Sequence, residues 1–246
     1  MSERAVGWIH EVFSSIQGEG LFCGQRHIFV RFAGCNLSCA YCDEPSARMP
    51  NPRGCRIAAA VNGASCLQVP NPVRAEDLAQ YCTKLTGRTI SLTGGEPLLQ
   101  AEFASELARL LKQLGFAVHL ETNGTLFDAV SNIAALVDVV AMDIKVPSAS
   151  GCVLWDQHKL FLKSALRTGA FVFVKAIVGP TTTEDEIIQC AYTIASESTK
   201  VPLVIQPVNS DRSVPGELLM KLQAVALDRL EDVRVIPQCH KFLGLP

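Results

Sequence analysis

The stretch Gly34-Cys35-Asn36-Leu37-Ser38-Cys39-Ala40-Tyr41-Cys42 carries three cysteines in a C-x3-C-x2-C spacing. Cysteine thiolates are the usual ligands of iron–sulfur clusters, and a [4Fe–4S] cubane has four irons. Three thiolates this close together can bind three of the irons and leave the fourth open to a small molecule. We therefore interpret Cys35, Cys39 and Cys42 as the ligands of a [4Fe–4S] cluster.

Two simpler explanations of these cysteines compete with the cluster. A structural zinc site normally has four protein ligands, and no fourth Cys or His follows at short spacing. The chain has ten Cys, and some free Cys pack in cores like small hydrophobic residues. The motifs farther along the chain favour the cluster, because a short motif is best tested by its context.

Composition limits the class of protein. A length of 246 residues suits one domain covering 1–246, and 48% hydrophobic residues are ample for a core. The net charge of −2 offers no broad basic surface for nucleic acid. The N-terminus lacks an apolar signal-peptide core, and no apolar stretch is long enough to span a bilayer. Ten Cys without a secretory signal favour a reducing cytoplasm, so we expect a cytoplasmic protein with a small-molecule substrate.

Strand-like and helix-like runs alternate along the chain. The strand-like runs are His27–Ala33, Thr89–Thr93, Ala117–Thr122, Val139–Ile144, Phe171–Val178, Leu203–Val208 and Val233–Ile236. The helix-like runs are Ala75–Thr86, Leu99–Leu114, Leu126–Leu136, Asp156–Thr168, Glu184–Ser196 and Pro215–Leu227. This alternation predicts an α/β fold with a parallel sheet. Because there are too few units for a closed eight-stranded barrel, we expect an incomplete, open parallel β/α barrel.

One stretch interrupts the alternation. Residues 45–71 are rich in Pro and show little periodicity, which predicts an insertion or a long loop directly after the cluster segment. Cys55 and Cys66 lie within it. Two isolated thiols are weak evidence for a second metal site, and we expect ordinary loop cysteines.

Polar residues stand near the carboxyl ends of the predicted strands, where buried strands are normally apolar. They alternate with apolar neighbours, so each polar set shares one face. Barrel enzymes place their chemistry at this end of the strands, and we expect these residues to line the lumen. They are Arg31, Ser91, Thr93, His119, Glu121, Asn123, Asp143, Lys145, Lys175 and Gln206.

Three segments after the cysteines resemble the S-adenosylmethionine (SAM) site of the radical SAM superfamily. Thr93-Gly94-Gly95-Glu96-Pro97 is similar to its Gly-Gly-Glu-Pro loop, where Glu96 would meet the methionyl ammonium and glycines would allow close approach. Glu121-Thr122-Asn123-Gly124 resembles the strand end that contacts the ribose, and Gln206-Pro207-Val208 resembles the late strand that borders the adenine. Within the cysteine motif, Tyr41 fits the aromatic just before the third Cys, which lies near the adenine. The resemblance implies SAM-binding residues Tyr41, Thr93, Gly94, Gly95, Glu96, Glu121, Asn123, Lys145, Gln206, Pro207 and Val208.

Three further features resemble the 7-carboxy-7-deazaguanine synthase family. They are the run Ser14–Gly20, Arg31 four residues before Cys35, and the C-terminal run Pro237–Pro246. The resemblance implies a carbon–nitrogen lyase that contracts the ring of 6-carboxy-5,6,7,8-tetrahydropterin to 7-carboxy-7-deazaguanine, losing ammonia, in queuosine and deazapurine biosynthesis. It also implies a homodimer and an external electron donor such as flavodoxin.

The same resemblance implies which residues bind the pterin. Arg31 suits the substrate carboxylate because guanidinium pairs with carboxylate through two bonds. The full set is Ile16, Gln17, Gly18, Glu19, Arg31, Thr93, His240 and Pro246, the last through the chain's terminal carboxylate. From the residues alone, Gln17–Gly20 could be only a turn and His240 a surface residue. No catalytic acid or base is assigned, although His119 and Glu121 lie on the relevant face.

One departure from the family concerns Mg2+. The family usually has Thr or Ser two residues after the third cluster Cys, where its hydroxyl binds Mg2+, but here the run is Cys42-Asp43-Glu44-Pro45. Glu44 either replaces the hydroxyl, since Mg2+ accepts carboxylate readily, or points away. Two alternative functions also stay open: a radical SAM activase that makes a glycyl radical on a partner, and an electron-transfer iron–sulfur protein.

Overall fold

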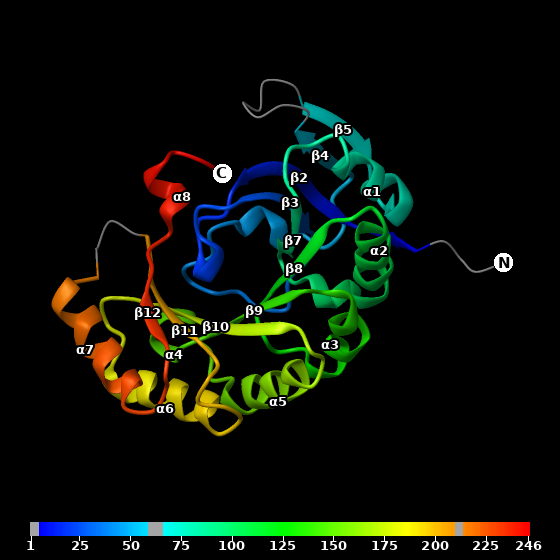
Figure 1. Ribbon diagram of the computed structural model, residues 1–246. Coiled ribbons are helices and arrows are strands. Elements are labelled where there is room, and N and C mark those ends of the chain that lie inside the picture. Colours follow the sequence, from blue (N-terminus) through cyan, green and yellow to red (C-terminus); the bar gives the residue numbers. More distant parts are fainter. Residues whose placement is uncertain (1–4, 59–65, 210–213) are drawn as a thin grey trace.

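The computed structural model describes residues 5–58, 66–209 and 214–246, and its main feature is a curled sheet of ten strands (Figure 1). The strand order is β12-β11-β10-β9-β8-β7-β3-β2-β4-β5. Seven neighbouring strands are all parallel. These are β3 (Arg26–Phe32), β7 (Thr89–Gly94), β8 (Ala117–Thr122), β9 (Val139–Ile144), β10 (Phe171–Val178), β11 (Leu203–Pro207) and β12 (Val233–Val235). The outermost strands β12 and β5 do not pair with each other, so the open parallel barrel is confirmed.

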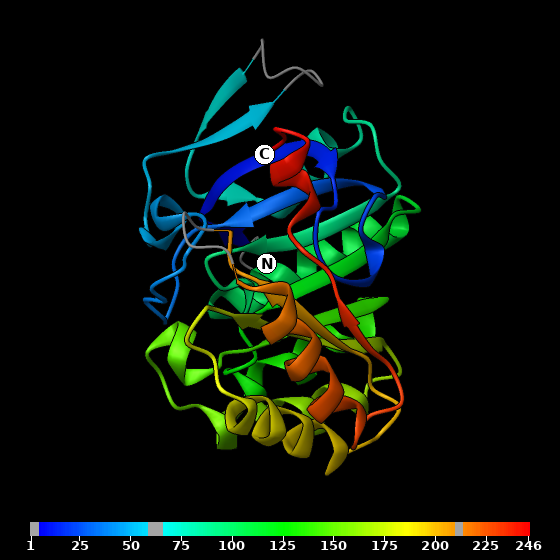
Figure 2. The same cartoon turned by 90° about the vertical axis from the view of Figure 1, so that its left-hand side faces the viewer.

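Three strands that the sequence did not predict extend this sheet. β2 (Ile9–Ile16) runs antiparallel to β3, β4 (Gly54–Ala58) is parallel to β2, and β5 (Cys66–Pro70) is antiparallel to β4. The antiparallel pairs β2–β3 and β4–β5 therefore lie at one edge of a sheet that is otherwise parallel. Figure 2 shows the β4–β5 hairpin projecting from the rest of the sheet. A further small sheet joins β1 (Val6–Gly7) to β6 (Val73–Arg74).

The stretch 45–71 is not a structureless loop in its described part. It holds the short 3-10 helix η2 (Pro45–Arg48) and most of the β4–β5 hairpin. The hairpin is short, and its strand β5 is largely exposed, which explains the weak sequence pattern. Cys55 is buried in β4 and Cys66 is exposed in β5, and residues 59–65 of the stretch lie outside the described residues.

Helices cover the outer face of the curled sheet (Figure 1). The six long ones match the six predicted runs within a few residues at each end. They are α1 (Ala75–Cys82), α2 (Ala101–Gln113), α3 (Phe127–Ile133), α5 (Trp155–Leu166), α6 (Glu184–Ala195) and α7 (Gly216–Leu227). Short elements are α4 (Pro147–Ser150), α8 (Cys239–Phe242), η1 (Gly20–Phe22), η3 (Pro97–Gln100) and η4 (Ala134–Leu136). Within the described residues, every helix is too short or too polar to cross a membrane.

Local chemistry fixes several helix ends. Thr183 accepts a hydrogen bond from the Glu186 N–H while Glu186 accepts one from the Thr183 N–H, which is a capping box at the start of α6. Such a box satisfies two N–H groups that the helix itself leaves unpaired. On α2, Leu107 and Leu111 are fully buried against the sheet, whereas Leu114, just past the helix end, is 44% exposed.

The protein has two apolar clusters, a large one and a small one. The large core lies between the sheet and its helices. A second, small cluster of Ala141, Phe173 and Val204 packs with Leu21, Phe22, Val139 and Ile236. His119 contacts Phe22 and Phe173 ring to ring at 5.2 and 6.0 Å between centroids. These side chains fill the barrel and leave its carboxyl-terminal end free for a cavity.

Candidate functional site

A cavity of about 810 Å3 lies at the carboxyl ends of β7–β11. The cluster loop, the segment after β2 and the C-terminal tail form the rest of its wall. Every site residue predicted from the sequence lines this cavity except Glu96. Its size falls within the range of known ligand pockets.

The three cysteines of the cluster loop share this cavity wall. The Leu37 N–H donates to Cys35 Sγ at 3.4 Å, and Asn123 holds the loop by donating to Asn36 Oδ1 at 2.8 Å. Burial raises the pKa of the Cys35 and Cys39 thiols, and ligation must remove those protons.

The spacing of the thiols bears on which metal group the three cysteines could hold. Among the described residues, the only set of three candidate ligand atoms within 4.8 Å of one another comes from His10, Glu11 and Glu44. The cysteines therefore do not converge on one point, as the ligands of one tetrahedral zinc must. A cubane receives each thiolate on a different iron. Three thiols that line one cavity from a single loop fit that group.

The two glycines after β7 fit against the cluster loop itself. A Cβ on Gly95 would lie 1.9 Å from the Gly34 carbonyl oxygen, and Gly94 has φ +117°. The Glu96 N–H donates to Gly34 O at 2.8 Å. We predicted that these glycines allow close approach to SAM; the structure shows in addition that they allow the loop after β7 to pack on the cluster loop.

Glu96 lies behind the cavity wall and is fully buried. Its carboxylate accepts hydrogen bonds from Leu98 N (3.0 Å), Thr122 Oγ1 (2.9 Å) and Asn123 N (2.7 Å). Burial raises its pKa to about 7 despite these donors. Its contacts join the end of β7 to the end of β8, so its geometry supports a structural link, and its contact with the SAM ammonium stays a prediction.

The predicted adenine and ribose side of the cavity contains Tyr41, Lys145 and Gln206. The Lys145 ammonium lies 5.5 Å from the centre of the Tyr41 ring, a cation–π distance. Lys145 also forms an ion pair with Asp143 at 2.9 Å. The Gln206 Oε1 atom is buried without a hydrogen-bond partner in the described structure. An orphaned acceptor in the wall is what a ligand with N–H or O–H groups would satisfy.

A chain of charges crosses the floor of the cavity from β9 to the segment after β2. Asp143 lies between Lys145 and Lys175, and Lys175 Nζ lies 3.2 Å from Asp143 Oδ1 and 2.5 Å from Glu19 Oε2. Burial would raise the pKa of Asp143, but the two lysines outweigh it and hold the pKa below its usual value. Gln238 Nε2 donates to Glu19 Oε1 at 2.7 Å and also contacts Asp43.

Glu121 lines the cavity between Gln17 and Thr93. Its carboxylate accepts hydrogen bonds from Gln17 Nε2 at 2.7 Å and from Thr93 Oγ1 at 2.9 Å. Burial raises the pKa of Glu121, and Lys175 only partly opposes the shift. Glu121 is therefore the acid in this cavity whose proton affinity is increased, while Glu19 nearby stays ionised with a pKa lowered to about 2.

Residues of the C-terminal tail line one side of the cavity, and Figure 2 shows the tail running from β12 to α8. The Cys239 N–H donates to the Gly18 carbonyl at 2.8 Å. A Cβ on Gly18 would lie 2.0 Å from His240 Nδ1, so only glycine lets the imidazole pack there. His240 and Pro246 both line the cavity. The geometry thus brings the Gln17–Glu19 segment beside a tail more than 200 residues away in sequence.

Arg31 is held by a carboxylate of its own chain. Its Nε donates to Glu11 Oε1 at 2.9 Å, and its guanidinium carbon lies 5.5 Å from the centre of the Phe13 ring. Arg56 also pairs with Glu11. Burial would raise the pKa of Glu11, but Arg56 and Arg31 together lower it. Among the described residues no second carboxylate pairs with Arg31, so its terminal nitrogens are available to a ligand.

Comparison with known proteins agrees with this architecture. The sequence profile of the Radical SAM superfamily matches residues 29–201. The chain is 39% identical over 246 residues to the 7-carboxy-7-deazaguanine synthase of Geobacter sulfurreducens, covering 96% of each chain. It belongs to the 7-carboxy-7-deazaguanine synthase family of radical SAM proteins. The corresponding protein of Methanopyrus kandleri is 37% identical over 96% of this chain and 92% of its own.

Solved structures support the fold. A crystal structure of QueE from Escherichia coli has a TM-score of 0.60 at 21% identity, over 96% of this chain and 95% of its own. A structure of TYW1 with a lysine–pyruvate adduct bound has a TM-score of 0.59 at 12% identity, over 83% of this chain and 74% of its own. At such identities the likeness shows the fold alone. The family membership disfavours the activase and the electron-transfer alternatives.

The sequence analysis did not assign several residues that line this cavity. Asp143 and Lys175 were predicted as lumen-facing but were not assigned to a site, and Glu11, Asp43 and Gln238 were not singled out. For Asp143 and Lys175 the interrupted apolar strand was a usable signal. Asp43 and Gln238 stand in quoted motifs, but nothing in the sequence shows that they meet.

Two other lumen residues do not reach the cavity. His119 and Ser91 are buried below it, where His27 Nδ1 lies 2.8 Å from Ser91 Oγ and the His27 and His119 rings are 5.7 Å apart. His119 lies on the same face of β8 as Glu121, as expected, but it packs among aromatic rings one layer deeper and does not line the cavity.

Proposed function

We propose that the protein catalyses the radical SAM ring contraction of 6-carboxy-5,6,7,8-tetrahydropterin to 7-carboxy-7-deazaguanine with loss of ammonia, in the biosynthesis of queuosine and related deazapurines. The observation that carries the proposal is the shared cavity: the three-cysteine loop and the Gln17–Glu19 and His240–Pro246 segments face the same space. An activase would need room for a partner's backbone instead of this tail.

The chain's residues would hold the cofactors as follows. Cys35, Cys39 and Cys42 would bind the [4Fe–4S] cluster and leave one iron to SAM, and together the cluster and SAM supply the 5′-deoxyadenosyl radical when bound. Tyr41 and Gln206 border the space for the adenosine, and Asn123 ties the cluster loop to β8 through Asn36. The remaining members of the predicted SAM set are Thr93, Gly94, Gly95, Glu96, Glu121, Lys145, Pro207 and Val208.

The substrate would lie between Arg31 and the tail. Arg31 would pair with the substrate carboxylate, because its Nε is fixed by Glu11 and its fork faces the cavity wall. Glu19, Gln17 and the Pro246 carboxylate would accept hydrogen bonds from the pterin, and His240 would add a ring nitrogen. Ile16, Gly18 and Thr93 complete the surface. Glu121, with its raised pKa, is placed to hold or release a proton there.

Glu44 is our proposal for the Mg2+ ligand. It lines the main cavity next to the cluster loop and also lies close to His10 and Glu11. Oxygen ligands suit Mg2+. Glu11 is already paired with two arginines, so Glu44 is the better candidate of the two acids. Replacing Glu44 by Gln should weaken the stimulation of turnover by Mg2+, and an unchanged Mg2+ dependence would remove Glu44 from the site.

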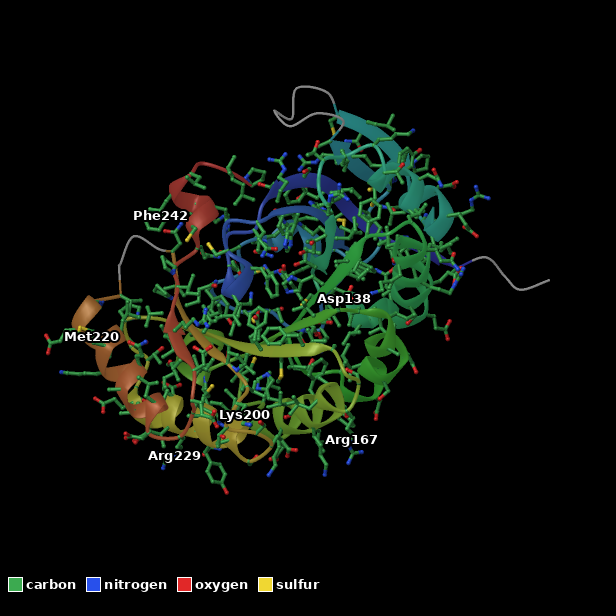
Figure 3. All side chains as sticks on the ribbon, viewed as in Figure 1. Asp138, Arg167, Lys200, Met220, Arg229 and Phe242 are labelled. Atoms are coloured by element: carbon green, nitrogen blue, oxygen red, sulfur yellow. The ribbon has the colours of Figure 1, made fainter. Side chains whose placement is uncertain are left out.

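We propose that the protein works in the cytoplasm as a homodimer, with residues 1–246 folding as one domain. An external donor such as flavodoxin would reduce it, and it would have no nucleic-acid or membrane partner. Exposed apolar side chains support a protein contact: Met220 on α7 is 72% exposed and Phe242 on α8 is 81% exposed (Figure 3). Sedimentation of the parent and a Phe242→Ser variant would test whether this side forms the dimer.

The decisive experiment is anaerobic turnover. Reconstituted protein, SAM, reductant and 6-carboxytetrahydropterin should yield 7-carboxy-7-deazaguanine, detected by absorbance and mass. A Cys39→Ala variant should lose the cluster absorbance and all product. If the parent cleaves SAM but leaves the pterin untouched, the proposed substrate is wrong, and if it binds no cluster the radical mechanism is wrong as well.

A further inference from the structure

Lys175 is a buried cation on a strand that is otherwise apolar. It is 4% exposed and follows Val174 on β10, which is fully buried. Its ammonium forms ion pairs with two carboxylates from different elements, Glu19 at 2.5 Å, which is also a hydrogen bond, and Asp143 at 3.2 Å. A buried charge is costly unless it is paired and hydrogen-bonded. An apolar residue here would avoid that cost, so the fold retains Lys175 for something other than packing.

Glu19 is the partner of Lys175 that faces the substrate side. One oxygen accepts from Lys175 and the other from Gln238, and the carboxylate still borders the cavity. Glu121, Asp143 and Asp43 are the acids around it, and His240 and Cys23 are its titratable neighbours on the tail and the η1 segment. Lys175 is the only cation with an ion pair to Glu19 among the described residues.

The balance of these groups decides whether Glu19 is charged. Burial raises the pKa of Glu19, yet the ion pair and hydrogen bond with Lys175, the Gln238 hydrogen bond and the nearby His240 bring the pKa down to about 2. The pKa of Lys175 is in turn raised by Asp143 and Glu19 against the effect of burial. Without the lysine, burial among acids would favour the protonated carboxyl.

We infer that Lys175 is a positioning residue that holds Glu19 as an anion, aimed at the N–H donors on the aminopyrimidinone edge of the pterin. The inference rests on the proposed function. Only an ionised carboxylate accepts through both oxygens, and adjacent N–H groups on one ring edge match that pair. Lys175 thus acts on substrate recognition through Glu19.

Replacing Lys175 by Met tests this directly. Hydrogen bonds to a charged acceptor are worth more than neutral ones, so KM for the pterin should rise about 10- to 100-fold. The pH profile is the specific readout. In the parent, KM should be flat between about pH 6 and about pH 8; in Lys175→Met, KM should fall as pH rises, because the higher pKa lets Glu19 ionise only in alkali. Lys175→Arg keeps the charge and should restore the flat profile.

A double-mutant cycle covers the case in which Lys175→Met folds poorly. In a Glu19→Gln background the acceptor is already neutral, so adding Lys175→Met should change pterin KM less than twofold, and the two effects should be non-additive. If the double variant binds pterin far more weakly than Glu19→Gln alone, Lys175 acts by another route and the inference is overturned.

The controls separate this inference from the proposed function. Lys112→Met removes a surface ion pair with Asp138, 2.5 Å long, and should leave KM and its pH profile unchanged. Iron content and SAM affinity should be the same in all variants. If the parent makes no deazaguanine, the proposed function fails; if the parent does and Lys175→Met keeps a low, pH-independent KM, only the role of Lys175 fails.

Discussion

Replacing Gly95 by Ala should push apart the two loops that build the SAM side of the cavity. The added Cβ would lie 1.9 Å from the backbone oxygen of Gly34, and real contacts of this kind are essentially never below 3.0 Å. The loops must therefore separate by about 1.1 Å. Because the obstacle is backbone on both sides, no side-chain rotation can relieve it.

The size of the effect follows from two contributions. Forcing atoms into a packed site costs about 1 to 3 kcal/mol. The 2.8 Å bond from Glu96 N–H to Gly34 O would also break, at about 1 kcal/mol. We expect the free energy of unfolding to fall by about 2 to 4 kcal/mol. SAM should also bind more weakly, since Gly34 precedes the first cluster cysteine.

The assay compares urea midpoints by circular dichroism at equal iron content, together with SAM affinity by equilibrium titration. Gly216→Ala is the matched control, because its Cβ meets nothing within 4 Å and its φ is not left-handed. Its midpoint should be unchanged or slightly higher, as Ala favours a helix over Gly. If Gly95→Ala matches that control in midpoint and in SAM affinity, the contact between the two loops is not as tight as described.

Three other perturbations have expected outcomes. Burial lowers the pKa of His27 from 6.5 to about 4, so only the unfolded chain takes up its proton between those values, and a contribution of about 3 kcal/mol to stability should be lost as pH drops from about 6.5 to about 4. His119 and His158, whose pKa values burial also lowers, add to the fall. His27→Gln should therefore remove only the His27 share of the slope, and an unchanged slope would show that His27 contributes none of it. Arg31→Lys should raise pterin KM about tenfold with iron content intact, because the two-pronged pairing is lost, while Arg56→Lys, outside the main cavity, should not. Thr183→Ala should lower the free energy of unfolding, measured with urea, by about 1 kcal/mol because it removes the α6 cap. An unchanged free energy would mean that the capping box does not stabilise the protein.

The parallel part of the fold was predictable because each strand is a local apolar run followed by an amphipathic helix. The bounds of β8, β9 and β10 agree with the predicted runs to the residue. β2 escaped prediction because His10, Glu11, Ser14 and Ser15 interrupt its apolar pattern. Its stability comes from pairing with β3 on one side and β4 on the other, and such tertiary partners leave no mark in a local window.

The sequence predicted on which face of a strand each site residue lies, but not which residue it pairs with. Alternation along a strand showed that Lys175 points into the lumen. It could not show that its partner is Glu19, which stands 156 positions earlier in the chain. The contact of Gln238 with Asp43 spans 195 positions. A single sequence shows which residues are charged but not which of them form pairs. The pairs depend on how the C-terminal tail and the segment after β2 meet at Gly18.

The depth of a side chain inside the barrel was the second property that the sequence could not predict, as His119 and Glu121 show. They lie two residues apart on the same face of β8, so periodicity treats them alike. Their positions in the sheet register differ. His119 pairs with Ser91 and Val139, at the level where aromatic rings fill the barrel. Glu121 pairs with Ala141, one level nearer the open end of the barrel. Burial then acts on each in opposite ways, lowering the pKa of the imidazole and raising that of the carboxyl, so both are driven towards their neutral forms. Of the two side chains, only Glu121 lines the cavity, and nothing in the local sequence of β8 marks that difference in depth.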